Sequence, residues 1–476
     1  MELDQDLQAR QQARSLAKAA HDAQVLLAQM PQRKLDAIVK AVADAFFQAA
    51  PELAEMAVQE TGFGNVSDKI TKNEFASRDV YKAIENMTCV GVLKEDAREK
   101  LWEIGVPVGV IGAIVPSTNP TSTVCYKALI ALKSGNSILF SPHPKALACT
   151  VKAAHIVAQA AVSAGAPAGS VGCLNIPSMA GCREMMESPY VRLILATGGP
   201  AMVKAAYSSG KPAIGVGAGN GPAYIHSSAN VQQALAAILQ SKNFDYGTVC
   251  ASEQSIIVER VMERAVVDTA KTMGYYFMTK AEAQQLAKLL FKPNGSLSPD
   301  VVGKSALHLA KIAGFPVPSG TKILVAAADQ VGPAHPYSME KLCPVLALFV
   351  ENDEAAVLEK SIQILSHEGS GHTFSIHAQD EAVIRRFALE IPVSRFLVNT
   401  PAALGGIGHS TGLFPALTLG CGAVGGSSSS NNISPMDLIN VRRVAWDTGN
   451  VQEKATQTVD SNLIDLLAEK ILERLK

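Results

Sequence analysis

The chain has 476 residues, of which 48% are hydrophobic and 18% charged, and its formal net charge is -1. This composition is typical of a globular protein of two or three domains and excludes a disordered chain. The balanced charge indicates neither a nucleic-acid partner nor an anionic membrane. The polar N-terminus does not resemble a secretory signal, and the apolar run from Val106 to Val115 is too short to cross a bilayer. We therefore expect a soluble cytoplasmic protein that binds neither nucleic acid nor a membrane.

The first half of the chain predicts helices followed by alternating strands and helices. Apolar residues recur at helical spacing over residues 3 to 60, and a buried strand is expected from Val106 to Val115. The alternation continues with helices at 126–134, 146–164, 180–186 and 200–207, and with strands at 137–140, 171–175 and 191–197. This order is typical of a mostly parallel, doubly wound sheet, which binds ligands at the carboxyl ends of its strands.

The alternation restarts after Val231, so we expect a second α/β domain and a boundary near residues 225 to 235. Helices are predicted at 234–239, 262–273 and 354–361, and strands at 254–258, 323–326 and 345–350. The tail differs, because residues 446–460 are polar and the residues after them place leucine and isoleucine on one helical stripe. Such an amphipathic helix either docks on this chain or a neighbouring subunit, or serves as a recognition tag for another protein.

One of the eight cysteines, Cys250, is a candidate covalent nucleophile. It follows a Gly-Thr turn in FDYGTVCASEQ, where small neighbours leave a carbonyl carbon room to reach the thiol. A single cysteine is more often a small buried hydrophobe, and we expect this of most of the others. No two cysteines form a C-x-x-C pair, so neither a metal site nor a dithiol redox motif is expected.

Two turns after predicted strands are candidates for cofactor binding. An apolar strand runs into Thr197, Gly198 and Gly199 and then into a helix, which is the arrangement that presents backbone N–H groups to a phosphate. The spacing is not G-x-G-x-x-G, and a tight turn explains the glycines about as well. The strand at 137–140 is followed by polar side chains that either contact a ribose or phosphate or form a solvated turn: Ser141, His143 and Lys145.

A third turn, VPSTNPTST, places Asn119 just after a buried strand. A side-chain amide in this position can donate a hydrogen bond to a developing oxyanion. Asn before Pro is also a common turn pair, so the residue alone leaves both interpretations open.

Together these stretches resemble the aldehyde dehydrogenase superfamily, and within it the CoA-acylating branch. The resemblance covers about residues 5 to 445. It is carried by GVPVGVIGAIVPSTNPTST (105–123), ATGGPAMVKAAYSSGKPAIGVGAGN (196–220), TVCASEQS (248–255), EKLCPVLA (340–347), GHT (371–373) and PALTLGCGAVGG (415–426). These segments are similar to the aldehyde dehydrogenase half of bifunctional aldehyde–alcohol dehydrogenases, and the iron-dependent alcohol dehydrogenase half is not expected because the chain ends at residue 476.

The resemblance implies the α/β aldehyde dehydrogenase fold, with two doubly wound α/β domains and a small oligomerisation hairpin. The cofactor-binding domain would be residues 1–229, interrupted by the hairpin at about 88–106, and the catalytic domain would be residues 230–435. An oligomerisation strand at 436–447 would complete the hairpin, whose edge pairs with another subunit, so a homodimer or higher homo-oligomer is expected. Residues 448–476 would be a polar linker and the amphipathic helix. In enzymes of bacterial microcompartments such helices bind shell proteins, so residues 460–476 are a candidate encapsulation tag.

The resemblance also implies residue roles. The Cys250 thiolate would add to the aldehyde carbonyl, and Asn119 with the backbone N–H of Cys250 would hold the oxyanion. Hydride would then pass to NAD or NADP, leaving a thioester. His372 would assist thiol proton transfer or contact the cofactor. The cofactor itself would be held by Ser141, His143, Thr197, Gly198, Gly199, Gly217 and Glu340, the last through the nicotinamide ribose.

The molecule that accepts the acyl group from the thioester, water or coenzyme A, decides the enzyme class. Hydrolytic members of the superfamily carry a glutamate in a Glu-Leu-Gly-Gly motif, but the matching stretch from Gly215 to Asn220 has no carboxylate. Loss of a general base slows water attack by roughly 10²–10⁴-fold, whereas a thiol is already partly ionised near neutral pH. We therefore expect reversible thiolysis by coenzyme A to acyl-CoA. The alternatives are a hydrolytic aldehyde dehydrogenase, a nicotinamide-independent thiol acyltransferase and a catalytically dead microcompartment scaffold.

The aldehyde pocket is expected around Thr121, Thr248, Val249 and the loop from Ala402 to Phe414. Because these segments contain no Lys or Arg, a small neutral aldehyde such as acetaldehyde or propionaldehyde is the expected substrate. Serine, threonine and His409 are able to bind an anion, so sulfoacetaldehyde and succinate semialdehyde remain alternatives. The turn at 141–145 does not distinguish NAD from NADP.

Overall fold

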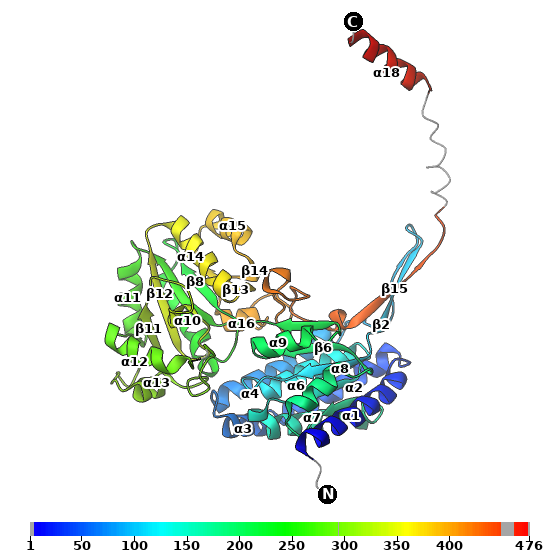
Figure 1. The fold of residues 1–476 in the computed structure, drawn as a ribbon, viewed down its shortest axis with the longest axis horizontal. Coiled ribbons are helices and arrows are strands. Elements are labelled where there is room, and N and C mark those ends of the chain that lie inside the picture. Colours follow the sequence, from blue (N-terminus) through cyan, green and yellow to red (C-terminus); the bar gives the residue numbers. More distant parts are fainter. Residues whose placement is uncertain (1–3, 294, 449–460, 475–476) are drawn as a thin grey trace.

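The computed structural model describes residues 4–293, 295–448 and 461–474 (Figure 1). These residues form two α/β domains, a small antiparallel sheet and a C-terminal helix. The two parallel sheets confirm the predicted fold class of doubly wound α/β domains.

The first domain is built on a five-stranded parallel sheet with the strand order β5-β4-β3-β6-β7. Its strands are β3 Val110–Ile114, β4 Ile138–Ser141, β5 Val171–Cys173, β6 Val191–Thr197 and β7 Ala213–Val216. Its helices are α1 Gln5–Leu27, α2 Gln32–Gln48, α3 Ala50–Thr61, α4 Val66–Glu74, α5 Val80–Ile84, α6 Pro120–Lys133, α7 Leu147–Ser163, α8 Met179–Glu187 and α9 Pro200–Tyr207. Successive strand residues face opposite sides, so Ile111 packs with α2, α6 and α7, whereas Val110 packs with α1 and α8. Helices therefore cover both faces of this sheet.

The second domain repeats this plan around a seven-stranded parallel sheet with the order β10-β11-β12-β9-β8-β13-β14. Its strands are β8 Gly221–Ile225, β9 Glu253–Glu259, β10 Tyr275–Phe277, β11 Ile323–Ala327, β12 Val345–Glu351, β13 Gly371–His377 and β14 Val393–Val398. Its helices are α10 Val231–Asn243, α11 Glu263–Thr272, α12 Lys280–Leu290, α13 Ala306–Ala313, α14 Glu354–His367, α15 Glu381–Glu390 and α16 Ala402–Gly406. Tyr224 packs with α12 to α15, and its neighbour Ala223 packs with α10 and α11.

The observed domain division lies earlier in the chain than residue 229, because β7 belongs to the first sheet and β8 to the second. The run from Val106 to Val115 also differs from the single strand expected from its composition. It contributes to β2, Leu101–Pro107, and to β3, which lie in different sheets. Gly109 separates them with a φ of +122°, and its N–H donates to the Asn136 Oδ1 at 2.9 Å. Apolar residues on both sides of the turn hide this break from periodicity.

A three-stranded antiparallel sheet projects away from both domains (Figure 1). It consists of β1 Gly91–Asp96 and β2, which form the predicted hairpin, and β15 Ile439–Ala445, the predicted late strand. Trp102 of β2 contacts Trp446 edge to face, with ring centroids 5.0 Å apart.

The tail contains the predicted helix, α18 Ser461–Arg474, which stands apart from the two domains in Figure 1. Three of its apolar side chains are exposed, namely Leu466, Ile471 and Leu472. The predicted polar linker lies almost entirely outside the described residues.

Among the described residues, one helical segment, Pro144–Ser163, is long and apolar enough to cross a membrane by length and composition alone. In the fold it contains α7, whose Ala153, Val157 and Ala161 are buried in the core shared with α2 and α6. Core packing therefore accounts for its apolar composition.

Candidate active site

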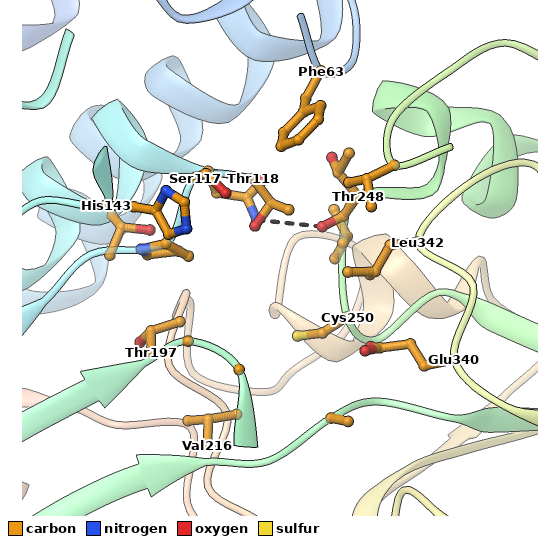
Figure 2. A pocket seen from close by; sticks show the side chains of 18 of the residues that line it. Phe63, Ser117, Thr118, His143, Thr197, Val216, Thr248, Cys250, Glu340 and Leu342 are labelled. Carbon is orange, nitrogen blue, oxygen red and sulfur yellow. Dashed lines mark hydrogen bonds between the residues drawn. The ribbon is translucent and has the colours of Figure 1, made fainter. Parts of the chain in front are cut away.

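A cavity of about 460 Å³ lies between the two domains, beside the carboxyl ends of β6 and β7 and the turn that carries Cys250 (Figure 2). Most of the predicted site residues line it, namely Cys250, Asn119, His143, Thr197, Gly198, Gly199, Gly217 and Glu340. Two predicted residues do not. Ser141 lines a smaller neighbouring pocket together with His143, and His372 is buried elsewhere.

The Cys250 side chain is partly buried in the cavity wall, close to the Glu340 side chain in Figure 2. The chain reaches it through three residues with left-handed backbone conformations, Asp245, Tyr246 and Gly247, whose φ angles are 47°, 50° and 76°. Burial raises the pKa of the Cys250 thiol to about 12, and the Glu340 carboxylate adds to this effect. The thiol is therefore protonated near neutral pH.

Asn119 is the N-cap residue of α6, followed by Pro120 in the first turn. An N-cap side chain usually accepts a hydrogen bond from its own helix, but the Asn119 side chain makes no such bond. Its Oδ1 instead accepts from the Lys72 Nζ at 2.5 Å. Its Nδ2 donates over 3.2 Å to the Thr118 Oγ1 and over 3.4 Å to the Thr248 carbonyl oxygen. These long contacts leave the nitrogen able to donate to a stronger acceptor in the cavity.

Behind Asn119 lies a buried ion cluster that sequence reasoning missed. Lys69 and Lys72, one turn apart on α4, donate to the Asp245 Oδ2 at 2.9 Å and 2.5 Å. All three side chains are at most 3% exposed. Burial lowers the pKa of Lys72 to about 8, although the Asp245 carboxylate opposes the shift. Burial would raise the pKa of Asp245, but Lys72 and Lys69 outweigh it and hold that pKa below its usual value.

A second part of the cavity has the features of a nucleotide site. The Thr197 hydroxyl is buried and has no hydrogen-bond partner within the described part of the chain. Gly199 and Gly217 leave open space where a Cβ would lie, so a ligand can approach their backbone. The Glu340 Oε1 accepts from the Gly219 N–H at 2.9 Å. An unpaired hydroxyl, open backbone before α9 and a carboxyl group suit the ribose and phosphates of NAD or NADP.

The wall beside Cys250 contains no carboxylate from the stretch between Gly215 and Asn220. Val216, Gly217 and Ala218 line the cavity there with an apolar side chain and backbone. Glu340 is the one carboxyl group among the described cavity-lining residues. Burial raises its pKa to about 8, so it is mostly protonated near neutral pH.

His372 is the second residue of β13 and is fully buried, away from the cavity lining. Its Nδ1 lies 2.9 Å from the Thr373 Oγ1, and its Nε2 has no partner among the described residues. Burial lowers the pKa of His372 to about 3, with a further contribution from Arg395, so its ring is neutral at physiological pH. Across the described ranges, no group of three or more His, Cys, Asp or Glu side chains is placed to hold a metal ion.

The remaining cavity wall is mostly apolar. The predicted Thr248 and Val249 line it, but of the loop from Ala402 to Phe414 only Ile407 does. Thr121 instead donates to the Asn73 Oδ1 at 2.8 Å, and His409 lies outside the cavity lining, 3.4 Å from the Asp79 carboxylate. The sequence did not indicate the other apolar lining residues, which are Phe63, Leu297, Pro299, Val302, Leu342, Leu417 and Leu419.

Comparison with known sequences places the site in a family. Residues 5–275 match the aldehyde dehydrogenase family. The bifunctional aldehyde-alcohol dehydrogenase AdhE of Escherichia coli K12 is 44% identical over 436 residues, which are 90% of this chain and 49% of the relative. The chain thus spans about half the length of the first curated relatives it matches. The acetylating succinate-semialdehyde dehydrogenase of Clostridium kluyveri is 34% identical over 91% of this chain and 95% of its own length.

Solved structures resemble the whole body of the fold. An acetylating aldehyde dehydrogenase from Geobacillus thermoglucosidasius has a TM-score of 0.92 and 47% identity, covering 94% of this chain and 99% of its own. A propionaldehyde dehydrogenase from Rhodopseudomonas palustris, solved with bound CoA and an acylated cysteine, has a TM-score of 0.82 and 28% identity, with 91% and 97% covered. A propionaldehyde dehydrogenase from the fucose utilisation microcompartment of Clostridium phytofermentans has a TM-score of 0.82 and 27% identity, with 90% and 96% covered.

Proposed function

The chain belongs to the aldehyde dehydrogenase family, and on this premise we propose that it is a CoA-acylating aldehyde dehydrogenase. The reaction converts an aldehyde, CoA and NAD(P) reversibly into acyl-CoA and NAD(P)H. One observation carries the proposal: Cys250 and Asn119 share a cavity whose wall at Val216 to Ala218 has no carboxylate to activate water.

In this mechanism Cys250 is the nucleophile. Its thiol loses a proton to the solvent, and the thiolate sulfur adds to the aldehyde carbonyl carbon, which turns the carbonyl oxygen into an oxyanion. The Asn119 Nδ2 and the backbone N–H of Cys250 donate to that oxyanion. A bound nicotinamide cofactor would supply the hydride acceptor, so that the carbon attached to the Cys250 sulfur is oxidised to a thioester. The residues that would hold this cofactor all line the cavity, namely His143, Thr197, Gly198, Gly199, Gly217 and Glu340.

Release of the acyl group from Cys250 favours a thiol over water. Water needs a general base, and the cavity wall at Val216 to Ala218 supplies no carboxylate, while Glu340, the one carboxyl group in the described lining, is assigned to the cofactor. The thiol of CoA is partly ionised without help and is a strong nucleophile. A relative with bound CoA and an acylated cysteine supports this route. His372 does not line the cavity, so a role in proton transfer to or from the thiol would act through other groups.

We propose a small neutral aldehyde, acetaldehyde or propionaldehyde, as the substrate. Many of the cavity-lining residues are apolar, and the cation that contacts Asn119, Lys72, already has three acceptors. An anionic aldehyde would have to rely on Lys145, which lines the cavity with its Nζ 5.4 Å from the centroid of the Phe63 ring. Succinate semialdehyde and sulfoacetaldehyde are therefore the competing substrates.

One assay tests both parts. Protein, NAD or NADP and each of the four aldehydes are mixed, CoA is added, and cofactor reduction is followed at 340 nm (about the absorbance maximum of reduced nicotinamide). We expect steady-state turnover only with CoA, and the highest kcat/KM with acetaldehyde or propionaldehyde. Steady turnover without CoA would instead indicate hydrolysis. Absence of any signal with every aldehyde would indicate an acyltransferase or a dead scaffold.

We also propose a homodimer or higher homo-oligomer. In the described chain β15 pairs with β2 along one edge only, and its other edge is open. Exposed apolar side chains on this sheet, Trp102, Val441 and Trp446, suit contact with a second subunit. Analytical ultracentrifugation should give at least twice the monomer mass, and Val441→Lys should lower that mass.

The tail helix α18 is proposed to bind microcompartment shell proteins, because its Leu466, Ile471 and Leu472 side chains are exposed. The enzyme would then be enclosed in a microcompartment within the cytoplasm. A variant that ends after Trp446 should keep its activity but lose co-sedimentation with purified shell protein. Equal co-sedimentation of the variant and the full chain would contradict the proposal.

A further inference from the structure

We propose that Lys72 is a positioning residue, whose ammonium group fixes the direction of the Asn119 amide so that the amide nitrogen faces the oxyanion. This rests on the proposed function, since an oxyanion arises only when Cys250 adds to an aldehyde. Lys72 lines the same cavity, but all three of its N–H groups already have acceptors, so none is left for the reacting atoms. It acts through Asn119, from a helix of the first domain that carries no recognised motif.

The chemistry of the two side chains permits one orientation of the amide. An ammonium group has three donors and no acceptor, so it can face only the oxygen of the Asn119 amide. On the opposite side the Thr248 carbonyl oxygen is an acceptor and can face only the amide nitrogen, which lies 3.4 Å away. A flipped amide would set donor against donor at Lys72 and acceptor against acceptor at Thr248. Both neighbours therefore select the same orientation, with the nitrogen toward the cavity.

Lys72 is in turn held by a complete set of acceptors. Its three N–H groups reach the Asn119 Oδ1, the Asp245 Oδ2 and the Thr248 Oγ1, the last at 2.9 Å. The Thr248 hydroxyl also donates to the Asp245 Oδ2 at 2.6 Å. No N–H group of Lys72 is left over, so the ammonium has a single defined position. This position is 3% exposed, which keeps water from replacing any of the three acceptors.

The backbone around Asp245 brings the carboxylate to this place. Asp245 has a left-handed φ of 47°, and its Oδ1 accepts from the Asn65 N–H at 2.9 Å. A Cβ on Gly64 would lie 1.8 Å from the same oxygen, so only glycine allows the carboxylate to approach. The segment around α4 and the turn before Cys250 thus contact each other in one preorganised arrangement. Hydrogen-bond donors stabilise a transition state best when they are already fixed before its charge develops.

The charge of Lys72 adds to its geometric role. A hydrogen bond from a cation to the oxygen of an amide polarises that amide and makes its nitrogen a better donor. In this structure the two N–H groups of the Asn119 side chain donate to two long hydrogen bonds, at 3.2 Å and 3.4 Å. An oxyanion is a far stronger acceptor than either partner, so the bond strengthens as the thiohemiacetal forms.

The test compares Lys72→Met with Lys69→Met. Each variant removes one ammonium from Asp245 and leaves the other, so their effects on stability should be similar. Lys69 donates to the Thr118 carbonyl oxygen at 3.0 Å and does not touch Asn119. Because an oxyanion donor is worth roughly 10²–10³ in kcat, we expect Lys72→Met to lower kcat by about 10- to 100-fold. Lys69→Met should keep kcat within about threefold, with KM for the aldehyde little changed in both.

A double-mutant cycle separates this role from a general loss of structure. In an Asn119→Ala background Lys72→Met should cost no more than about twofold further, because the residue through which it acts is gone. A second readout is the alkylation of Cys250 by iodoacetamide, followed by mass spectrometry of its peptide. Alkylation forms no oxyanion, so its rate should stay within about twofold of wild type in Lys72→Met.

Three results would overturn the proposal: full activity of Lys72→Met, an equal loss in Lys69→Met, or a full further loss in the Asn119→Ala background. If Lys72→Met does not fold, Lys72→Gln replaces it. The amide of that glutamine can turn together with Asn119, so a loss of about tenfold is expected and wild-type activity would refute the role. The wild-type CoA-dependent rate is measured first. If the wild type shows no CoA-dependent rate, the proposed function is refuted, but the role of Lys72 is not. The orientation of the Asn119 amide can then be followed by NMR. Its side-chain amide resonance should shift in Lys72→Met and not in Lys69→Met.

Discussion

Gly219 packs on the backbone of the nucleophile and has no room for an added methyl group. A Cβ at Gly219 would lie 1.9 Å from the Cys250 carbonyl oxygen and 2.7 Å from its carbonyl carbon. Real Cβ atoms essentially never come closer than 3.0 Å, so Gly219→Ala must push the two backbones apart by roughly 1 Å. Both obstructing atoms are main chain, so no side chain can rotate away. The displacement falls on the sulfur of Cys250 and on the bond from the Gly219 N–H to Glu340.

The expected magnitudes follow from that shift. A misplacement of about 1 Å in a reacting group costs about 100-fold in rate, and overpacking typically costs about 1–3 kcal/mol of stability. We therefore expect Gly219→Ala to lower kcat about 100-fold and to lower the free energy of unfolding by about 2 kcal/mol. The measurements are the CoA-dependent rate and urea unfolding followed by fluorescence.

Gly217→Ala is the matched control, because a Cβ there meets no atom within 4 Å. It should keep the wild-type free energy of unfolding and the wild-type rate of Cys250 alkylation, while KM for the nicotinamide cofactor rises. A Gly219→Ala variant with kcat within about threefold of wild type would refute the steric reasoning.

Three further predictions concern buried titratable groups. Glu340→Gln removes a carboxylate that raises the Cys250 pKa, so the pH midpoint of alkylation by iodoacetamide should fall, and an unchanged midpoint would contradict the coupling. Burial raises the Glu253 pKa to about 7, so the native state holds this proton more tightly than the unfolded state and loses stability as pH rises toward 7. As pH rises from about 4.5 to 7, the free energy of unfolding of Glu253→Gln should therefore increase relative to that of the wild type. A difference between the two proteins that does not change with pH would refute this. His372 has a pKa of about 3, so His372→Gln should keep every limb of the pH–rate profile above about pH 5, and loss of a limb would show that His372 titrates there.

Sequence periodicity predicted the parts of the fold in which burial alternates regularly. The strand from Val191 to Thr197 and the helix from Pro200 to Tyr207 agree with the structure to the residue. Periodicity failed where two elements share one apolar run, as at Gly109 between β2 and β3. It also missed the place of β8 in the second sheet, because strand pairing depends on contacts far apart in the sequence.

The candidate site shows the same limit more sharply. Cys250 and Asn119 stand out because their turns have recognisable residue patterns, and the cavity brings them together. Lys72 and Asp245 had no such pattern. Their pairing joins residues 173 positions apart, and the only local signal was a pair of lysines one turn apart on a helix whose next residues are buried. Ser141 was expected just after the strand but is the last residue of β4 and lines the neighbouring pocket, so its contact with the cofactor stays a prediction.

The way the two domains divide the cavity wall bears on how this protein can evolve and be redesigned. The polar groups around the nucleophile depend on α4, on Gly64 and on the turn before Cys250. Much of the apolar wall comes from other loops, through Leu297, Pro299, Val302 and Leu342, and none of these contributes to the ion cluster. Substitutions at these four positions can therefore change the substrate range without removing a member of the ion cluster. A mutant library restricted to them should yield new aldehyde preferences, whereas Gly64 should tolerate substitution as poorly as the nucleophile itself.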